Sequence, residues 1–305
     1  MKTAVIIFLS IVFCVPVFAD WESTGPDGGP IEYVVQSKQD PDVLYANSGM
    51  CKFARSEDGG LTWTRVGDYS SYSYSLGIGP TDILFSGGIF TVYISTDGAE
   101  SWNSSYVSGS YFQDIAPHPT DSSIIHATGF KYESSIYYMQ YIYSDDCGAT
   151  WNTSDLASDA KGSTIAFSAS SPDILYLGGY NPVSWGPMLY KSTDGGSNWS
   201  DITPAEWSSD YQTYSIAVHP SDPDIVVVSN RNYMYRSDDG GSSWTQVVGS
   251  ASIFDLAWSD ADSNVLYGGA GNYVYFSTDG GVTWNYSIMP EGGNYETIAA
   301  SSVAA

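Results

Sequence analysis

Basic residues are scarce in this chain of 305 residues, which has 10 lysines and arginines against 34 aspartates and glutamates. The formal net charge is −24 at pH 7, and a surface of this kind repels nucleic-acid phosphates and anionic membranes. We therefore expect neither nucleic acid nor an anionic membrane as a partner. Much of the acidity comes from aspartates placed in turns, and it also favours solubility.

Cysteine is rare as well, with three in the chain. Cys14 falls in an apolar run near the N-terminus, which leaves Cys51 and Cys147 in the rest of the sequence. These two belong to separate repeats of the pattern described below, so we expect no disulfide between them. A repeat protein of this size can bury an adequate core without one.

Long apolar runs are absent except at the N-terminus, where one runs from Ala4 to Phe18 after Lys2 and before Ala19. This arrangement is typical of a secretory signal peptide that covers residues 1–19, and the run is too short for a comfortable membrane span. We predict an exported monomer, secreted or held in the periplasm or on the cell surface. Residues 20–305 are expected to form a single domain that does not insert into a membrane.

An eight-residue pattern, Ser-x-Asp-x-Gly-x-(Thr/Ser/Asn)-Trp, recurs six times, and each copy is called a corner below. The tryptophans of consecutive corners lie 39, 49, 48, 45 and 40 residues apart. The corners are Ser56–Trp63, Ser95–Trp102, Ser144–Trp151, Ser192–Trp199, Ser237–Trp244 and Ser277–Trp284. A period of about 40–50 residues built from strand-like segments predicts a β-propeller with one corner in each blade.

The residue types of a corner are those of a hairpin turn. The aspartate can accept bonds from nearby backbone N–H groups, and the glycine can adopt a positive φ. The tryptophan is expected to pack into the seam between blades, where full burial would contribute about 4–6 kcal/mol as an upper estimate. These structural residues are Asp58, Trp63, Asp97, Trp102, Asp146, Trp151, Asp194, Trp199, Asp239, Trp244, Asp279 and Trp284.

Between corners, the sequence predicts four strands, A to D, in each blade. In the fifth repeat these are Tyr214–Val218, Ile225–Ser229, Tyr233–Arg236 and Trp244–Val248. The first repeat has Ile31–Val35, Val43–Ala46, Lys52–Arg55 and Trp63–Val66. Trp21–Gly25 resembles a D strand without its blade, and Tyr295–Val303 an A strand without its B and C strands. We predict an all-β fold of six complete antiparallel blades and a partial seventh, as in a truncated seven-bladed ring.

The corner pattern resembles the Asp-box, or bacterial neuraminidase, repeat over the whole chain from Trp21 onward. Sialidases, family-74 xyloglucanases, photosystem II assembly factors and sortilin-type receptors share that repeat, so the resemblance implies the fold and leaves the function open. The second corner departs from the pattern because Ala99 replaces glycine, which predicts a looser or differently shaped turn. In the third corner Cys147 occupies a variable position.

The turns after strands A and C should share one face, and ligands are expected on the other. That second face is built from the B–C loops and the links between blades, and loops on a rigid scaffold commonly carry function. Its predicted ligand-binding residues are Tyr132, Tyr137, Tyr138, Tyr180, Trp185, Trp207 and Tyr211. Such aromatics can stack on sugar rings or hold a protein partner, although they could also simply cover neighbouring blades.

A polar residue precedes the small apolar pair of each A strand and should face the central channel. These residues are Tyr33, Ser75, Asp114, Thr164, Ser215, Asp255 and Thr297. Asp114 and Asp255 would come from nearly opposite blades, and two carboxylates about 5–9.5 Å apart could serve as acid and base in glycoside cleavage. The alternative is that both are solvated groups that line the channel.

The sequence lacks features that the enzymes among these Asp-box families require. A sialidase needs a cluster of arginines, and the chain has only Arg55, Arg65, Arg231 and Arg236. The opening resembles that of the family-74 xyloglucanases, but Asn47-Ser48-Gly49 stands where their first catalytic aspartate is expected, and those enzymes place their site between two propellers. His118, His126 and His219 are expected to be structural, and neither Asp145-Asp146 nor Asp238-Asp239 supplies enough oxygens for calcium.

The sequence therefore favours a non-catalytic propeller that binds an extracellular polysaccharide or protein through its aromatic loop face. The alternative is a glycoside hydrolase that uses the carboxylates of the channel. Neither a metal nor any other cofactor is expected.

Overall fold

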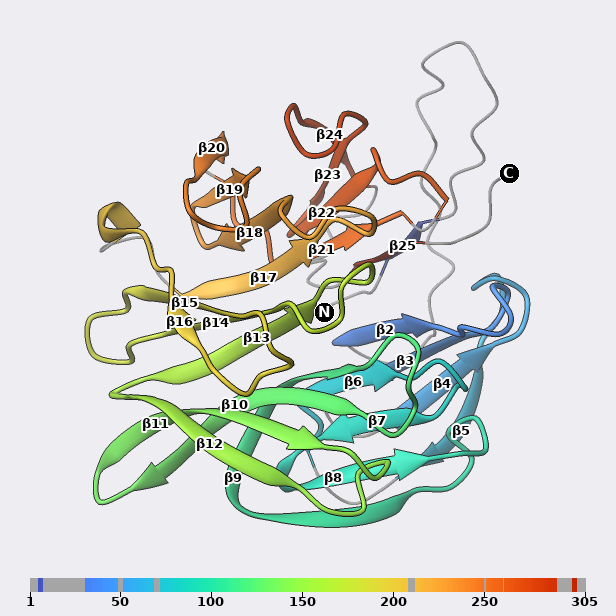
Figure 1. Cartoon of the computed structure of the whole chain (residues 1–305). Coiled ribbons are helices and arrows are strands. Elements are labelled where there is room, and N and C mark those ends of the chain that lie inside the picture. The colour runs from blue at the N-terminus through green and yellow to red at the C-terminus, as the bar shows by residue number, and fades with distance from the viewer. Residues whose placement is uncertain are drawn as a thin grey trace.

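A computed structural model describes residues 5–7, 31–48, 52–68, 72–207, 212–249, 251–259, 261–289 and 298–300. Within these ranges the regular structure is almost entirely β, with one 3₁₀ turn, η1 (Ala205–Trp207). Consecutive strands pair antiparallel into blades that follow one another in chain order around a common centre (Figure 1). In this part of the chain, none of the helical segments has the length and apolar character that crossing a bilayer requires.

The first three blades occupy residues 33–158. Blade 1 contains β2 (Tyr33–Gln36), β3 (Leu44–Ser48), β4 (Lys52–Ser56) and β5 (Thr64–Asp68). Blade 2 contains β6 (Ser75–Ile78), β7 (Leu84–Gly87), β8 (Ile89–Ser95) and the first half of β9 (Asn103–Pro117). Blade 3 contains the second half of β9, β10 (Ile125–Glu133), β11 (Ile136–Ser144) and β12 (Asn152–Ser158).

The next three blades follow the same order of strands. Blade 4 contains β13 (Lys161–Phe167), β14 (Leu175–Tyr180), β15 (Pro187–Ser192) and β16 (Ser200–Asp201). Blade 5 contains β17 (Thr213–Val218), β18 (Val226–Asn230), β19 (Tyr233–Ser237) and β20 (Thr245–Gly249). Blade 6 contains β21 (Asp255–Trp258), β22 (Leu266–Ala270), β23 (Tyr273–Ser277) and β24 (Asn285–Ile288). The prediction of six four-stranded antiparallel blades is confirmed.

Blades 2 and 3 share one strand, which the sequence pattern did not predict. The strand β9 has 15 residues. Its first residue, Asn103, pairs with β8 of blade 2, and its last residue, Pro117, pairs with β10 of blade 3. The two blades therefore form one seven-stranded sheet. The segment between them is rich in serine and tyrosine, and Gly109 alone adopts a positive φ, of 78°. Serine and glycine there would suit a turn, but the chain continues as a strand because it pairs with β8 and β10 on either side.

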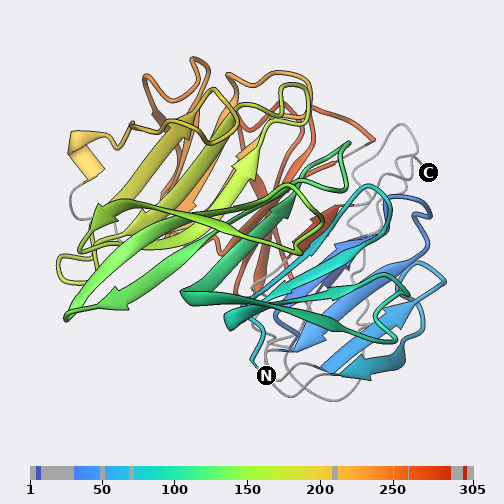
Figure 2. The same cartoon turned by 60° about the horizontal axis from the view of Figure 1, so that its bottom comes forward.

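The place of a seventh blade is partly filled. β25 (Ile298–Ala300) lies against both β21 and β2, where the A strand predicted within Tyr295–Val303 would stand. It pairs in parallel with β1 (Val5–Ile7), and Figure 2 shows red β25 beside the blue strands of blade 1. Residues Trp21–Gly25 lie outside the described residues. The truncated ring and the signal peptide therefore stay predictions.

Every corner is organised by the same hydrogen bonds. In the first, Ser56 Oγ donates to Asp58 Oδ1 over 2.8 Å and accepts the N–H of Gly60 over 2.7 Å. Asp58 in turn accepts the backbone N–H and the hydroxyl of Thr62, over 2.8 and 2.6 Å. The equivalent serine and aspartate bonds occur in the corners of Asp97, Asp146, Asp194, Asp239 and Asp279.

The second corner keeps this shape, so the prediction of a looser turn was wrong. Ala99 takes a φ of 69°, and its N–H reaches Ser95 Oγ over 3.0 Å, as glycine does in the other copies. A left-handed conformation costs a non-glycine residue about 1–2 kcal/mol. The bonds of Ser95 and Asp97 therefore hold the corner against this strain. Cys147 is likewise accommodated, at a φ of 59°.

The corner tryptophans pack into the seams between blades, as predicted. Trp102 of blade 2 lies 4.5 Å from Phe53 of blade 1, and Trp199 of blade 4 lies 5.1 Å from Tyr141 of blade 3, between ring centroids. In the first corner the indole N–H donates to the carbonyl of Gly60 over 3.0 Å. All six indoles are only half-buried, so each contributes less than the 4–6 kcal/mol expected for full burial.

The corners and the A–B turns lie on one face, as predicted, because they bond to each other. Gly59 N–H donates to the carbonyl of Asp42 over 2.8 Å, and Gly240 N–H donates to the carbonyl of Asp224 over 2.9 Å. The B–C loops and the links between blades therefore form the opposite face, which is called the loop face below.

The glycine at the fifth position of a corner can be tested against alanine. We expect Gly196→Ala to lower the free energy of unfolding by about 2–4 kcal/mol, because a Cβ there would lie 2.2 Å from Tyr141 Oη and Gly196 has a φ of 87°. Ala99→Gly is the matched control, and we expect a change within about 1 kcal/mol, since relief of strain offsets the lost methyl. Urea unfolding measures both. Equal stability of Gly196→Ala and the wild type would contradict the account.

The corner aspartates should make stability fall in acid. Hydrogen bonds from the Thr283 hydroxyl and then from its N–H hold the pKa of Asp279 at about 2, and side-chain bonds lower the pKa of the other five likewise. Because the unfolded chain takes up these protons first, the free energy of unfolding should fall as the pH drops from about 4 to about 2.

The variant Thr283→Val removes one of these donors, and Thr245→Val alters an exposed strand threonine as the control. We expect Thr283→Val to be less stable than the control at pH 6, and we expect this deficit to shrink at pH 2, where Asp279 is protonated in the unfolded chain and about half protonated in the folded one. The measurement is urea unfolding at both pH values. A deficit of the same size at pH 2 would show that the carboxylate is not its cause.

Candidate functional site

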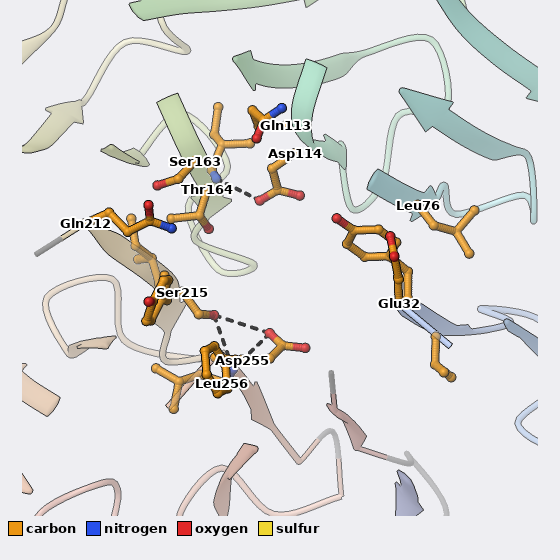
Figure 3. Close-up of a pocket in the computed structure, with 16 residues that line it drawn as sticks. Glu32, Leu76, Gln113, Asp114, Ser163, Thr164, Gln212, Ser215, Asp255 and Leu256 are labelled. Carbon is orange, nitrogen blue, oxygen red and sulfur yellow. Dashed lines mark hydrogen bonds between the residues drawn. The ribbon is translucent and has the colours of Figure 1, made fainter. Parts of the chain in front are cut away.

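A central cavity of about 560 Å³ opens among the A strands of all six blades. Three consecutive positions of these strands line it. The middle positions are Tyr33, Asp114, Thr164, Ser215 and Asp255, called the inner ring, and the preceding positions are Glu32, Gln113, Ser163, Tyr214 and Phe254, called the rim ring. The following positions form an apolar floor of Val34, Leu76, Ile165, Ile216 and Leu256. The lining thus changes from mostly polar to apolar over the three positions of each strand. Figure 3 shows these residues around the cavity.

The prediction that the polar A-strand positions face the channel holds for the five residues of the inner ring. Ser75 is fully buried instead, and its Oγ accepts the N–H of Gly87 over 3.2 Å within blade 2. Thr297 lies outside the described residues.

Asp114 joins two blades. Its Oδ1 accepts its neighbour Ile115 N–H over 2.8 Å, and its Oδ2 accepts the N–H of Ile165 in blade 4 over 2.9 Å. Burial raises the pKa of this carboxyl to about 6, against the opposing effect of these hydrogen bonds. Both carboxylate oxygens are therefore engaged by backbone donors, which is the geometry of a structural link between blades.

Asp255 has a related arrangement in blade 6. Its Oδ1 accepts its neighbour Leu256 N–H over 2.9 Å and the Ser215 hydroxyl of blade 5 over 3.3 Å. Figure 3 shows Asp114 and Asp255 reaching the cavity from different walls, each held by its own set of bonds. Neither carboxylate bonds to the other, so the two are separate links between neighbouring A strands rather than a coupled pair.

A row of stacked rings crosses blades 2 and 3 on the loop face, called the aromatic row below. Tyr111 and Phe130 stack at 4.9 Å with an interplanar angle of 4°, and Phe90 and Tyr137 meet this pair edge-on at 4.9 and 5.6 Å. Tyr132 extends the row, 4.6 Å from Tyr137 and 53% exposed. Five rings thus form a continuous surface that ends in an exposed tyrosine.

Two lysines cover parts of this surface. Lys161 Nζ lies 4.4 Å from the centre of Phe130 and 4.0 Å from that of Tyr137, and its burial there lowers the pKa of the ammonium. Lys131 Nζ lies 4.9 Å from the centre of Tyr138 and pairs with Asp155 over 2.6 Å. Tyr138 is therefore occupied by a lysine, and the accessible faces belong to the outer end of the row.

The loop between β14 and β15 holds the Trp185 side chain in an exposed position. Asn181 Oδ1 accepts the N–H groups of Val183 and Ser184 over 2.8 and 2.9 Å, and the Asn181 carbonyl accepts Trp185 N–H over 2.8 Å. Trp185 has a φ of 60°, is 50% exposed and stacks on Tyr180 at 5.5 Å with an interplanar angle of 8°. We call this stacked pair the platform.

The platform adjoins the aromatic row. Lys161, which covers Phe130 and Tyr137, is the register partner of Tyr180. Burial, and secondarily the neighbouring Tyr137, raises the pKa of the Tyr180 hydroxyl. Tyr132, Tyr137, Tyr138, Tyr180 and Trp185 are therefore brought together on the loop face of blades 3 and 4.

Trp207 does not belong to this surface, so its prediction as a ligand-binding residue was wrong. It is 2% exposed and packs against Tyr235 at 4.4 Å and Trp244 at 5.3 Å, in the seam between blades 4 and 5. The η1 turn directs the indole inward, where it completes an apolar cluster. Tyr211 lies outside the described residues.

The sequence reading missed the rim ring and much of the aromatic row. Phe90, Tyr111 and Phe130 lie inside strands, where aromatic residues commonly belong to the core. The rim residues could have been found by counting one position back from each predicted channel residue. Glu32, Gln113, Ser163, Tyr214 and Phe254 are the residues found in that way.

The histidines are structural in the described residues. His118 Nδ1 accepts the N–H groups of Thr120 and Asp121 over 3.3 and 3.0 Å, and His219 caps its own turn through Ser221. His126 Nδ1 bonds to Tyr141 Oη over 2.8 Å, and burial lowers its pKa to about 4. Within the same ranges, no group of three or more histidine, cysteine or acidic side chains could hold a metal ion.

Known proteins share both the repeat of this sequence and the fold of this structure. A sequence profile described as the BNR/Asp-box repeat matches residues 275–286, which include the sixth corner. The structure is similar to that of an ancestral GH74 enzyme, with a TM-score of 0.68 and 20% identity over 86% of this chain and 38% of that one. The chain is an Asp-box β-propeller.

The propeller is also similar to a GH74 xyloglucanase from Xanthomonas campestris, with a TM-score of 0.66 and 18% identity over 86% of this chain and 47% of that one. A structure of YCF48 bound to D1 peptide gives a TM-score of 0.59 and 14% identity, over 86% and 87% of the two chains. No curated protein matches the sequence. The propeller spans less than half the length of either GH74 enzyme, and identities this low establish the fold alone.

Asp114 and His126 should have opposite effects on stability between pH 4 and pH 6.5. The folded pKa of Asp114 is about 6 against 3.8, so the free energy of unfolding should fall by on the order of 2 kcal/mol as the pH rises from 4 to 6. The folded pKa of His126 is about 4 against 6.5, so the contribution of His126 to the free energy of unfolding should fall by a similar amount as the pH drops from 6.5 to 4.

The single variants Asp114→Asn and His126→Gln separate the two effects. We expect the stability of His126→Gln relative to the wild type to rise as the pH falls from 6.5 to 4, and that of Asp114→Asn relative to the wild type to rise as the pH increases from 4 to 6.5. Urea unfolding at steps between pH 4 and pH 7 measures this. Parallel pH profiles for the wild type and both variants would contradict the assigned pKa directions.

Proposed function

We propose that this propeller binds a polysaccharide, without cleaving it, through the platform and the exposed end of the aromatic row. The observation that carries the proposal is Trp185, an exposed indole kept at a positive φ by the hydrogen bonds of its own loop. A bulky residue in that conformation is strained, and such strain persists where the surroundings maintain it, commonly at ligand sites.

The chemistry of the surface supports a sugar ligand. The rings of Trp185 and Tyr132 present flat apolar faces, and hydrogen-bonding groups of the rim ring lie on the same side of the molecule. Sugars offer apolar C–H faces together with hydroxyls, so they suit a surface that combines both. The printed description of one GH74 neighbour as a xyloglucanase is a further reason to test glucans first.

The predicted signal peptide supports an extracellular setting for this binding. Residues 2–19 combine a positive charge, a short apolar run and a terminal alanine. We include export in the proposal on that ground. Cleavage after Ala19, read by N-terminal sequencing of protein from the expressing cells, is the direct test.

A glycoside hydrolase is the second candidate. In its favour are the raised pKa of Asp114, which would suit a proton donor, and the two GH74 neighbours. Against it, both oxygens of Asp114 already accept backbone N–H groups, so the carboxyl is engaged in the link between blades 3 and 4 rather than directed at a substrate. We therefore favour binding without cleavage.

Replacing the exposed indole should remove binding. We expect Trp185→Ala to weaken the affinity for a bound polysaccharide by about thirtyfold, the effect of losing ~2 kcal/mol at an aromatic hot spot. Affinity gel electrophoresis with xyloglucan, hydroxyethyl cellulose and chitosan measures retardation by each polymer. Tyr106→Ala is the matched control, because Tyr106 is 71% exposed and lies on the outer strand of blade 2.

Three outcomes contradict the proposal. Lack of retardation by any polysaccharide would leave a protein partner as the better interpretation. Equal retardation of Trp185→Ala and Tyr106→Ala would place the binding elsewhere. Release of reducing ends by the wild type, lost in Asp114→Asn, would establish the hydrolase.

A further inference from the structure

The central cavity is connected to the aromatic surface by two strands. On β9, Tyr111 belongs to the aromatic row and Gln113 to the rim ring. On β13, Lys161 covers the row and Ser163 belongs to the rim ring. Two residues along a strand correspond to about 7 Å, so the row begins roughly that far from the cavity. A ligand that lies on the row can therefore continue inward to the axis.

The groups that a ligand would meet at the cavity mouth are suited to hydroxyls. Gln113 and Gln212 contribute amides and Glu32 a carboxylate, with the rings of Tyr214 and Phe254 5.2 Å apart beside them. The Ser163 hydroxyl donates to the carbonyl of Thr213, so it can offer a ligand only its acceptor side. A volume of about 560 Å³ falls within the range typical of small-molecule sites. The mouth thus combines a few polar groups with ring faces, as a sugar-binding pocket does.

The floor of the cavity does not suit the continuation of a sugar chain. Ile165, Ile216 and Leu256 line this cavity and also a second one of about 520 Å³ on the corner side. That second cavity is walled mainly by proline, alanine and larger apolar residues, among them Pro117, Phe167 and Trp258. Moving hydroxyls into such surroundings without hydrogen-bond partners is costly. A chain that enters from the loop face would therefore end at the floor.

The charge of the cavity limits which sugar fits. Its lining includes Glu32, Asp114 and Asp255, and no lysine, arginine or histidine lines it in the described part of the chain. A carboxylate-bearing sugar would bring a further negative charge into a concave site of a protein with a net charge of −24. Neutral and amine-bearing sugars avoid that repulsion.

We propose that the cavity binds the terminal unit of a neutral or amine-bearing glycan chain whose inner units lie along the aromatic row and the platform. The inference rests on the proposed polysaccharide binding and adds to it that the propeller recognises chain ends. Gln212 is then a specificity residue. It is half-buried at the cavity mouth.

Binding capacity distinguishes chain ends from chain interiors. Xyloglucan, hydroxyethyl cellulose and chitosan are each cut into fractions of known mean length, and the amount of wild-type protein bound per gram at saturation is measured by sedimentation. Recognition of ends predicts that tenfold shorter chains bind about tenfold more protein per gram. Fractions of polygalacturonate are expected to bind at least tenfold less than the best neutral or amine-bearing polymer.

A pair of variants tests the cavity itself. We expect Gln212→Ala to weaken binding of a six-unit oligosaccharide of the retained polymer by at least tenfold. Gln246→Ala, on the outer strand β20, is the matched control and should leave binding unchanged. If the amount of protein bound per gram is the same for long and short chains, and binding still requires Trp185, the recognition of chain ends is overturned and the proposed function stands. Binding that no longer depends on Trp185 would overturn the proposed function itself.

Discussion

The serine hydroxyl that opens each corner is the contact on which the rest of the structure depends. One oxygen donates to the aspartate two residues on and accepts an N–H four residues on, as Ser237 does with Asp239 and Gly241 over 2.8 Å each. The turn is closed by these two bonds, and the indole that follows, Trp244, is thereby set against the preceding blade. Because the turn is fixed by hydrogen bonds rather than by glycine alone, it also tolerates an alanine at a positive φ in the second copy.

The closed corners also join neighbouring blades. Their carbonyls accept donors from the blade before: Lys191 Nζ reaches the carbonyl of Gly240, and Arg236 Nε that of Gly280, each over 2.8 Å. Two of the chain's few basic residues are therefore engaged in assembling the ring. With their aspartates, carbonyls and indoles occupied, the corners have little left to offer a ligand. The loop face is consequently the better candidate for a functional surface.

The sequence predicted the blades well, since hairpin turns and alternating strands are local features. The four strands of the fifth repeat were placed within one residue of those from β17 (Thr213–Val218) to β20 (Thr245–Gly249). What failed depends on long-range contacts. Composition alone could not distinguish Trp207, buried by the 3₁₀ turn that carries it, from Trp185, held outward by Asn181. The fused β9 escaped prediction because its serines and Gly109 would suit a turn, and only its pairing with β8 and β10 keeps the segment extended.

The cavity shows why the channel residues singled out from the sequence are not the best candidates for binding. A polar side chain in the middle of an innermost strand lies next to the backbone of the following blade, and it bonds there. Asp114 thus reaches the N–H of Ile165, and Ser215 reaches that of Leu256 over 3.2 Å. One position earlier the strand has only begun, so side chains of the rim ring, such as Glu32, stand at the mouth instead. In this molecule the inner ring holds the blades together, and the rim ring borders the cavity mouth, where Ser163 adds one further link through the carbonyl of Thr213.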